Sequence, residues 1–325
     1  MISRALLASV LLVGLAVVAG VSYEAVMARG DATRYPPPGR LIAVGGHRLH
    51  LHCLGAGPTV VLNSGAGGFS AEWRLVQSEM AREARVCAFD RAGLGWSEPG
   101  PEPRTPERIA LETHLLLTNA GEAGPYVLVA HSAGGKHARL FAQRYPKEVS
   151  GLVLVDPRSE YVEDHMTSQE AEAERATTRD FRQMVGRTRS LGLLRLTWAA
   201  LWPSALPVTA KLPHDLRETL GILQSQPGHL RTAEAEDAAA ATNNDELRGA
   251  LLGNVPLFIL GSGTQVERDA NWRGSLEYQA GLSTNSRLEV LPGRDHCIHW
   301  DDPGPVVAAV RKVLEATRSG ERLSP

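Results

Sequence analysis

The chain has 325 residues, of which 43% are hydrophobic and 22% charged, and this ordinary globular balance excludes a disordered or collagen-like protein. Its formal net charge of −2 argues against nucleic acid as a partner, because such proteins usually carry a basic excess that neutralises phosphates. The three cysteines, Cys53, Cys87 and Cys297, are too few and too scattered for a disulfide framework and leave the redox compartment open.

A membrane anchor is predicted at the N-terminus. Residues 5–23 form an uncharged run of 19 residues, and as a helix this run would be roughly 28 Å long, close to the hydrocarbon thickness of a bilayer. A cleaved signal peptide is the alternative, although residues 18–20 make only a weak cleavage site. Arginines lie on both sides of the run, so charge alone does not orient it. We predict a transmembrane anchor and Pro-rich linker over residues 1–39.

After the linker, short β-rich runs alternate with helical stretches. The runs 41–44 and 48–54 flank two glycines and are typical of a hairpin. Among the later runs, the continuous Val/Leu stretches 127–129 and 152–155 are expected for parallel strands that helices cover on both faces. These predicted strands are 59–63, 85–89, 126–130, 151–155, 257–260 and 287–291, and the predicted helices are 73–82, 104–120, 133–145 and 304–317. The pattern predicts an α/β fold with a mostly parallel central sheet.

The interval between residues 155 and 257 contains no convincing strand. Because about a hundred residues far exceed an ordinary connection between strands, we predict a helical cap over 157–255, inserted between core segments 40–156 and 256–325. Such a cap would lie beyond the carboxyl ends of the strands, where open α/β sheets bind ligands. We expect its acidic run, 160–174, to be a solvated helix face. Its apolar stretch, 191–202, should pack on the core, line the pocket or touch the bilayer, and packing is the commonest fate of an apolar helix face.

The strongest chemical signal surrounds Ser132. A buried strand ends at Ala130, a helix follows the serine, and small residues stand two positions before and after it (Ala130 and Gly134). A tight strand–turn–helix needs small residues there, and the turn would expose the Ser132 hydroxyl above the sheet beside a helix N-terminus. The pattern predicts a nucleophile, although a serine that merely caps a helix is a common alternative.

A serine nucleophile needs a base, and the loop after the last predicted strand supplies histidines. His296 comes first in this loop and lies nearer the strand end than His299, so we predict His296 as the base. Its late position also matches the hydrolase order of serine, acid and histidine. A metal site of His296, Cys297, His299 and Asp301 is the weaker alternative, because the spacing matches no zinc pattern closely.

A glycine-rich turn after the strand 59–63 predicts an oxyanion hole. Glycines at 65, 67 and 68 would let backbone N–H groups approach a ligand. We predict that the N–H groups of Ala66 and Ala133 stabilise the developing oxyanion. The alternative is a dinucleotide site, since Gly65, Gly67 and Ser70 nearly match the Rossmann spacing, but the turn does not follow the first strand and the third glycine is missing.

Over residues 40–317 the chain resembles the α/β-hydrolase superfamily, in its serine-nucleophile branch. The resemblance rests on motifs that occur in the family's order, although Ser64 replaces the usual His of the first motif and Asp295 replaces a common Gly. These motifs are Ser64-Gly65-Ala66-Gly67, Asp90-Arg91-Ala92-Gly93-Leu94-Gly95-Trp96-Ser97, the Ser132 turn, Val155-Asp156-Pro157 and Asp295-His296. The apolar N-terminus followed by 35–39 resembles a bacterial subgroup of membrane-anchored hydrolases.

The resemblance implies a third catalytic residue, a carboxylate that orients His296. In the family this acid usually follows the strand after the cap, where Thr264 stands in place of an Asp and the candidates are Glu267 and Asp269. In some members it follows the strand before the cap, where Asp156 ends 151–155. We predict Asp156 and keep Glu267 and Asp269 as alternatives.

The expected activity is cleavage of an ester or related acyl bond in a small molecule, with no metal or organic cofactor. Relatives that open epoxides or remove halides use an Asp nucleophile, whereas this chain has Ser132 in that place. Resemblance to anchored relatives implies a catalytic domain outside the cytoplasm. The alternative functions are an NAD(P)-binding oxidoreductase and a catalytically silent protein that only binds ligands.

Overall fold

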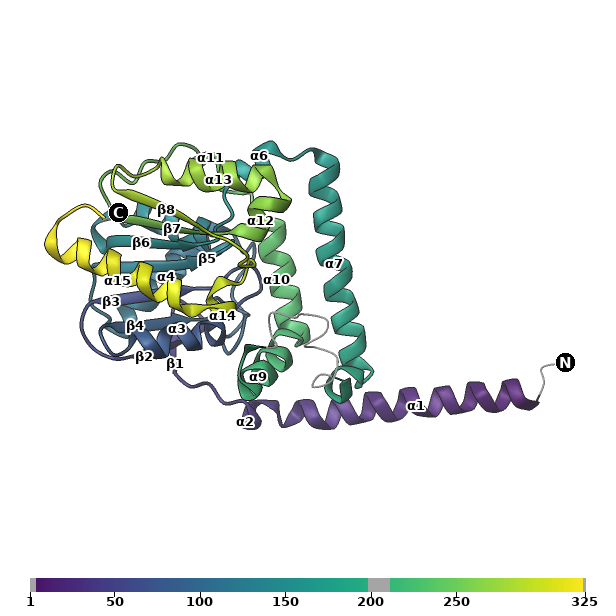
Figure 1. Cartoon of the computed structure of the whole chain (residues 1–325). Helices are drawn as coiled ribbons and strands as arrows, with labels where there is room; N and C mark the ends of the chain where they lie inside the picture. The colour runs from purple at the N-terminus through teal and green to yellow at the C-terminus, as the bar shows by residue number, and fades with distance from the viewer. Residues whose placement is uncertain (1–3, 198–210, 324–325) are drawn as a thin grey trace.

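The computed structural model of the chain describes residues 4–197 and 211–323, and its centre is an eight-stranded sheet (Figure 1). The strand order is β1-β2-β4-β3-β5-β6-β7-β8. β1 and β2 pair antiparallel with their neighbours, and the remaining pairs are parallel. The strands are β1 (Arg40–Ala43), β2 (Arg48–Leu54), β3 (Thr59–Asn63), β4 (Arg85–Phe89), β5 (Tyr126–His131), β6 (Val149–Val155), β7 (Leu257–Ser262) and β8 (Ser286–Leu291). The predicted α/β architecture is confirmed.

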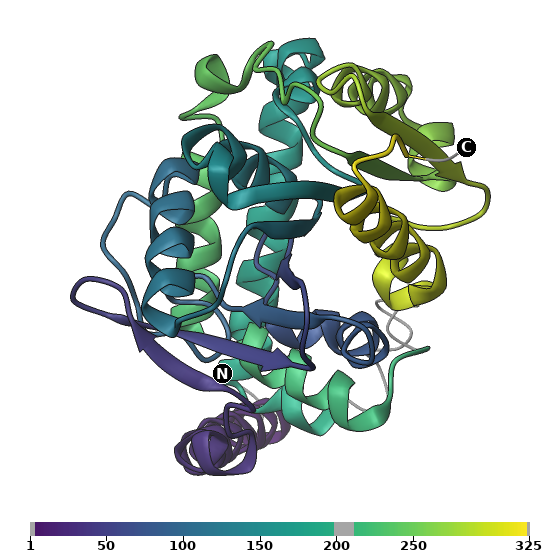
Figure 2. The ribbon, with the colours of Figure 1, turned by 90° about the vertical axis from the view of Figure 1, so that its left-hand side faces the viewer.

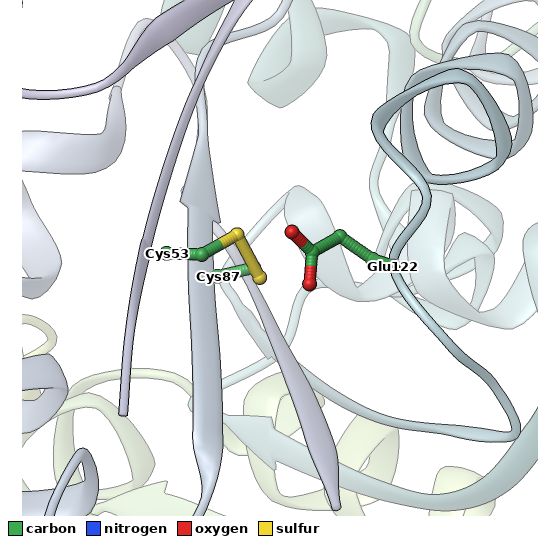
Figure 3. Close-up of side chains that lie close together, drawn as sticks. All are labelled: Cys53, Cys87 and Glu122. Carbon is green, nitrogen blue, oxygen red and sulfur yellow. A yellow bond between two sulfur atoms is a disulfide. The ribbon is translucent and has the colours of Figure 1, made fainter. Parts of the chain in front are cut away.

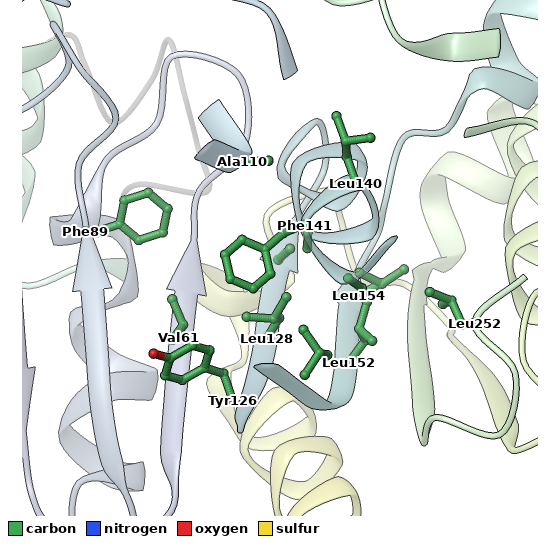
Figure 4. Packing of buried hydrophobic residues seen from close by; sticks show 14 of the residues in the cluster. Val61, Phe89, Ala110, Tyr126, Leu128, Leu140, Phe141, Leu152, Leu154 and Leu252 are labelled. Atoms are coloured by element: carbon green, nitrogen blue, oxygen red, sulfur yellow. The ribbon is translucent and has the colours of Figure 1, made fainter. Parts of the chain in front are cut away.

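Helices cover both faces of the sheet (Figure 2). Side chains alternate along each strand, so that Val61 of β3 packs in one apolar cluster while Val60 and Leu62 pack in the other. The first cluster, shown in Figure 4, lies under α4, α5 and α13, and the second lies under α3 and α15. These helices are α3 (Arg74–Met80), α4 (Pro106–Ala120), α5 (Gly134–Arg144), α13 (Ala270–Ala280) and α15 (Pro303–Ser319).

Local sequence explains where α4 begins and ends. Thr105 caps its first turn by accepting a hydrogen bond from the Arg108 backbone N–H, and Pro106 occupies the first helical position, where its missing N–H costs nothing. Gly121 ends the helix with a φ of 73°, a left-handed conformation that glycine adopts readily. The helix therefore begins two residues later than predicted.

The segment between β6 and β7 is helical and contains no strand among its described residues. Val162 of α6 and Leu247 of α11 pack in the first core cluster, and Leu216 and Leu220 of α9 pack with Phe69 and Trp300. The cap boundaries at 157 and 255 remain a prediction, and residues 198–202 of the predicted apolar stretch lie outside the described residues. The helices of this segment are α6 (Glu160–His165), α7 (Ser168–Ser190), α9 (His214–Gln224), α10 (Pro227–Ala239) and α11 (Asn244–Leu247), and the short helices elsewhere are α2 (Asp31–Arg34), η1 (Ser70–Trp73), η2 (Pro146–Glu148), α12 (Gly263–Arg268) and α14 (Ile298–Asp301).

Helix α13 and the acidic run 160–174 also depart from the sequence-based expectations. Helix α13 was not predicted, because its buried face mixes apolar Trp272 and Leu276 with polar Ser275 and Gln279. The acidic run 160–174 is not wholly solvated: Glu160 is 1% exposed and accepts two hydrogen bonds of 2.8 Å from the Arg139 guanidinium. Burial of that carboxylate is possible because the paired arginine satisfies it.

Cys53 and Cys87 form a disulfide between the adjacent strands β2 and β4 (Figure 3). The third residue in Figure 3, Glu122, lies near the sulfurs and is paired with Arg85. Sequence spacing did not predict this bridge, because the two cysteines become neighbours only through strand pairing. Cys297 is the free cysteine of the described residues.

Helix α1 (Arg4–Arg29) extends away from the sheet and passes the end of α7 (Figure 1). Within it, residues Leu6–Arg29 are long and apolar enough to cross a membrane. The most apolar 18 residues of this stretch are not buried against the rest of the chain. A signal sequence can have the same length and composition.

Candidate active site

Ser132 stands at the turn between β5 and α5 in a left-handed conformation, with a φ of 51°. A non-glycine residue rarely adopts this conformation, and such strain is typical of functional turns. Neighbouring backbone packs so closely that a Cβ on Gly134 would lie 2.7 Å from the Ser64 carbonyl oxygen. The requirement for a small residue two positions after the serine is therefore steric.

Ser132, His296 and Asp156 form one hydrogen-bonded chain. His296 Nε2 lies 2.9 Å from the Ser132 hydroxyl oxygen, and its Nδ1 lies 2.6 Å from Asp156 Oδ2. The three residues are far apart in sequence but meet at the carboxyl ends of β5, β6 and β8. The His296 side chain is 29% exposed, whereas Asp156 is completely buried.

The Asp156 carboxylate is held by donors that sequence reasoning missed. Its Oδ1 accepts hydrogen bonds of 2.8 Å from the Ser262 backbone N–H and from the indole N–H of Trp272. Oδ2 is left for His296. Nothing in the sequence pattern marks Trp272, because α13 brings it to β6 only in the folded chain.

The alternative acids lie elsewhere. Glu267 is exposed on α12, and Asp269 caps α13 by accepting a 2.8 Å hydrogen bond from the Asn271 backbone N–H. Thr264 hydrogen-bonds the Arg294 carbonyl and the Asp295 side chain. The geometry therefore brings Asp156, and not Glu267 or Asp269, to the His296 ring.

His299 stacks on Trp73, with ring centroids 4.5 Å apart, and is completely buried. Burial lowers the pKa of its imidazole to about 3, so the ring is neutral at physiological pH. The alternative metal set of His296, Cys297, His299 and Asp301 does not form a compact group of ligand atoms within the described residues. Among the described residues, one group of potential ligand atoms lies within 4.8 Å of one another, and it consists of Glu122 and the two disulfide cysteines, Cys53 and Cys87.

The glycine-rich loop 64–68 packs against the Ser132 turn. A Cβ on Gly65 would lie 3.0 Å from the Ser132 Cβ, so glycine permits this close approach. The N–H groups of Ala66 and Ala133 donate no hydrogen bond to another described residue. Both are therefore available to a bound group.

Two buried side chains hold the carbonyl groups of this loop. Arg91 donates hydrogen bonds of 2.7 Å to the carbonyl oxygens of Ser64 and Gly65 and is paired at 2.8 Å with Glu236 of α10. His229, also of α10, contacts the Gly67 carbonyl at 2.7 Å. Because a trans peptide points its C=O and N–H in opposite directions, holding the Gly65 carbonyl also orients the Ala66 N–H.

The surroundings of the site contain groups with perturbed pKa values. Burial raises the pKa of the Glu72 carboxyl to about 8, and burial lowers that of His229 to about 4. Burial also lowers the pKa of His131, whose Nε2 lies 3.1 Å from the His296 carbonyl oxygen. These three side chains are neutral near pH 7. The charged link between α10 and the loop therefore runs from Glu236 to Arg91 and from Arg91 to the loop carbonyls.

An apolar cavity of about 200 Å³ opens beside the loop. The loop residues Ala66 and Gly67 form one side of it, and residues of α7, α9 and α10 form the other, among them Phe181, Val185 and Ala233. The helical segment between β6 and β7 thus builds a pocket next to a predicted oxyanion donor.

Comparison with known proteins agrees with the α/β-hydrolase architecture. A family model described as alpha/beta hydrolase fold matches residues 58–303. The chain belongs to this family, and the predicted α/β-hydrolase fold is confirmed, which excludes the Rossmann alternative for the glycine-rich turn. Its relatives act on different bonds, so family membership establishes a hydrolase fold and not the substrate.

Among curated proteins, the chain is 25% identical over 263 residues to the YqjL protein of Bacillus subtilis (strain 168), covering 79% of this chain and 84% of that protein. It is 35% identical over 123 residues to 2-hydroxymuconate semialdehyde hydrolase of Pseudomonas sp. (strain CF600), covering 37% of this chain and 44% of that enzyme. The match to the YbdG protein of Bacillus subtilis (strain 168), at 31% identity, spans 37% of that protein's length.

Two solved structures illustrate the shared fold. A thermophilic esterase from Thermogutta terrifontis superposes with a TM-score of 0.63 at 24% identity, covering 86% of this chain and 98% of that one. An epoxide hydrolase from Bacillus megaterium superposes with a TM-score of 0.65 at 18% identity, covering 85% and 100%. At these identities the likeness concerns the fold alone.

Proposed function

We propose that the protein is a serine hydrolase that cleaves an ester or related acyl bond of a small molecule. The observation that carries this proposal is the hydrogen-bonded chain from Ser132 through His296 to the buried Asp156 carboxylate. Both His296 nitrogens are engaged in the order that a general base requires, with the acid on one side and the hydroxyl on the other.

In the proposed reaction, Ser132 attacks the acyl carbonyl while His296 Nε2 takes the hydroxyl proton. Asp156 keeps the Nδ1 proton in place and stabilises the imidazolium that forms. The N–H groups of Ala66 and Ala133 stabilise the oxyanion. His296 then protonates the leaving group, and water activated by the same ring releases the acyl group from Ser132.

The nucleophile favours acyl chemistry over epoxide opening, although structural neighbours include epoxide hydrolases. A serine ester formed with an acyl group is readily hydrolysed, whereas the resemblance links epoxide opening to a carboxylate nucleophile. No metal or organic cofactor is needed in this scheme. The remaining alternative is a silent protein that uses the same pocket only for binding.

The proposed division of the chain is an anchor and linker over 1–39, core segments 40–156 and 256–325, and a cap over 157–255. The cap would line the acyl pocket, which is supported by the contributions of α7, α9 and α10 to the cavity beside Ala66. Screening a series of ester chain lengths would test this role. A flat dependence on chain length would argue against an apolar cap pocket.

We also propose that the anchor holds the catalytic domain outside the cytoplasm. The Cys53–Cys87 disulfide supports this location, because disulfides persist in oxidising compartments. The full-length chain should remain in the membrane pellet after alkaline extraction and should be digested by protease added to intact cells. A chain with an intact N-terminus found only in the soluble fraction would contradict the anchor.

The catalytic proposal is tested with a fluorophosphonate probe and with short p-nitrophenyl esters. We expect the wild type to be labelled and to turn over the esters, and Ser132→Ala to lose both. The matched control is Ser64→Ala, since Ser64 is a second buried serine at the site whose hydroxyl bonds the Phe69 carbonyl. A folded wild type that is neither labelled nor active would leave only the silent alternative.

A further inference from the structure

The second half of α1 packs on the end of the cap. A Cβ on Gly20 would lie 2.1 Å from the Leu191 carbonyl oxygen, and one on Gly192 would lie 2.5 Å from the Gly20 carbonyl oxygen. The two backbones are therefore in direct contact where α7 ends. Figure 1 shows α1 continuing beyond this crossing, away from the rest of the molecule.

A buried cluster of four charges joins the same two parts. Arg189 contacts Glu24 at 2.9 Å and Asp31 at 2.8 Å, and Arg195 contacts both of these carboxylates at 2.6 Å. The four side chains are between 3% and 10% exposed. Two acids balance two arginines, so the cluster holds the cap on α1 without leaving an unpaired charge close to an apolar segment.

The position of this contact along α1 sets how deep the end of the cap would lie in a bilayer that α1 crosses. The uncharged run 5–23 is just long enough to cross the hydrocarbon core of a bilayer, so nearly all of it is needed for the span. Gly20 lies three residues before the end of that run, which is about 5 Å along the helix. An anchored chain would thus hold residues 191–192 at the depth that interfacial helices reach, roughly 5–10 Å into the headgroup boundary.

Exposed apolar side chains gather at this end of the cap. Outside α1, the described residues expose six large apolar side chains, and four of them lie in residues 181–196. These are Phe181 at 41%, Met184 at 53%, Leu193 at 46% and Leu196 at 66% exposure. Phe181 and Met184 share one face of α7, since they are three residues apart.

The same surface leads to the cavity beside the active site. Phe181 lines that cavity together with Val185, which follows it by one helical turn. The opposite wall is formed by Ala66, the predicted oxyanion donor, and Gly67. An acyl chain that entered past Phe181 would therefore arrive next to Ala66, whose neighbour Gly65 packs against the Ser132 turn.

We propose that residues 181–196 form a membrane-contacting face of the cap, which α1 seats in the lipid interface, and that the substrate is an acyl ester resident in the bilayer. The substrate assignment rests on the proposed hydrolase function, whereas the seating does not. The partner is the lipid bilayer that holds α1, because the face continues from an apolar helix whose 18 most apolar residues are not covered by the rest of the chain.

Seating is tested without any activity measurement, in full-length protein reconstituted into vesicles of phosphatidylcholine and phosphatidylglycerol. Leu193→Cys and Leu196→Cys are labelled with an environment-sensitive fluorophore, and Leu251→Cys, 73% exposed and outside the face, is the matched control. Cys297, the free cysteine of the described residues, should react slowly with the fluorophore, because burial raises the pKa of its thiol well above the usual value. Labelling of the wild type measures this background.

Nitroxides on the lipid acyl chains should quench the probes at 193 and 196 several-fold more strongly than the probe at 251, which aqueous iodide should quench instead. If the three probes respond alike, the face is not in the membrane and the proposal is wrong. This result would leave the catalytic proposal unaffected.

The substrate class is tested with the double variant Leu193→Asp, Leu196→Asp. We expect turnover of a long-chain ester embedded in vesicles to fall at least tenfold while a short soluble ester is hydrolysed at the wild-type rate. Equal loss on both esters, or no loss on either, would refute the lipid substrate. A wild type inactive on every ester would refute the catalytic proposal, and the quenching data would still decide the seating.

Discussion

The change Asp156→Asn tests the least obvious assignment at the site, the identity of the acid. Asp156 Oδ1 accepts two N–H donors, from Ser262 and Trp272, while Oδ2 faces His296 Nδ1. An asparagine must keep its carbonyl oxygen toward the two donors, because its NH₂ group cannot accept from them. The amide NH₂ is then forced toward His296 Nδ1.

This orientation would reverse the His296 tautomer. Facing an N–H donor, Nδ1 must become an acceptor, so the ring proton moves to Nε2. Nε2 would then donate to the Ser132 hydroxyl, 2.9 Å away, and could no longer take its proton. In serine-protease triads the same substitution lowers kcat by about 10⁴ through this tautomer, which corresponds to about 5.4 kcal/mol of lost transition-state stabilisation.

The assay is steady-state hydrolysis of a p-nitrophenyl ester, with thermal unfolding to confirm that the variant folds. Folding should be retained because both bonds to Oδ1 survive the substitution, each weakened by loss of the charge. The matched control is Asp269→Asn, the same chemical change at an acid whose role is to cap α13, where asparagine is also a good cap. We expect this control to remain near wild-type turnover.

A reversed outcome would refute the reasoning. If Asp156→Asn stays within a few-fold of wild type while Asp269→Asn or Glu267→Gln collapses, the working acid lies after the cap. Loss of turnover in Asp156→Asn accompanied by unfolding would instead point to a structural role for the buried carboxylate.

Three further substitutions test other buried groups of the described residues. Glu236→Gln should lower kcat by up to about 100-fold with KM little changed, because it removes the charged partner that holds Arg91 against the loop presenting the Ala66 N–H, and a single oxyanion donor is worth about 10²–10³; unchanged kinetics in the folded variant would contradict this. Glu72 is more protonated in the folded chain than in the unfolded one, so its contribution to the free energy of unfolding is present below about pH 4.5 and is lost as the pH rises through about 8. Glu72→Gln should remove this loss in urea titrations at pH 5 and 8, and an unchanged pH dependence would count against it. Replacing Cys87 by Ala should lower the free energy of unfolding by about 3–4 kcal/mol, since the bridge to Cys53 spans 34 residues, while reduced wild type and variant should unfold alike.

The sequence alone was sufficient for the features that depend on short stretches of chain. Six short β-rich runs and their spacing predicted the parallel strands, and the small residues around Ser132 predicted the tight turn. Both predictions succeed because strand burial and turn sterics act over a few neighbouring residues. The end of α4 at Ala120 was predicted for the same reason, whereas its start was predicted two residues too early, because the capping role of Thr105 was not recognised.

Only the tertiary structure brought together groups that are far apart in the chain. The sequence left Asp156, Glu267 and Asp269 as competing acids, since 140 residues separate Asp156 from His296 and no local pattern reports their contact. The Cys53–Cys87 bridge and the Arg91–Glu236 pair were likewise invisible, because strand pairing and docking of α10 create them.

The contact between α1 and the cap is the furthest from anything that a local pattern could predict. Sequence identified an apolar run at one end of the chain and an apolar stretch at 191–202, each by composition alone. That they touch depends on Arg189 and Arg195, which lie 158 residues or more from their carboxylate partners. Composition determines which segments avoid water, whereas the packing of the whole chain determines which of them lie side by side.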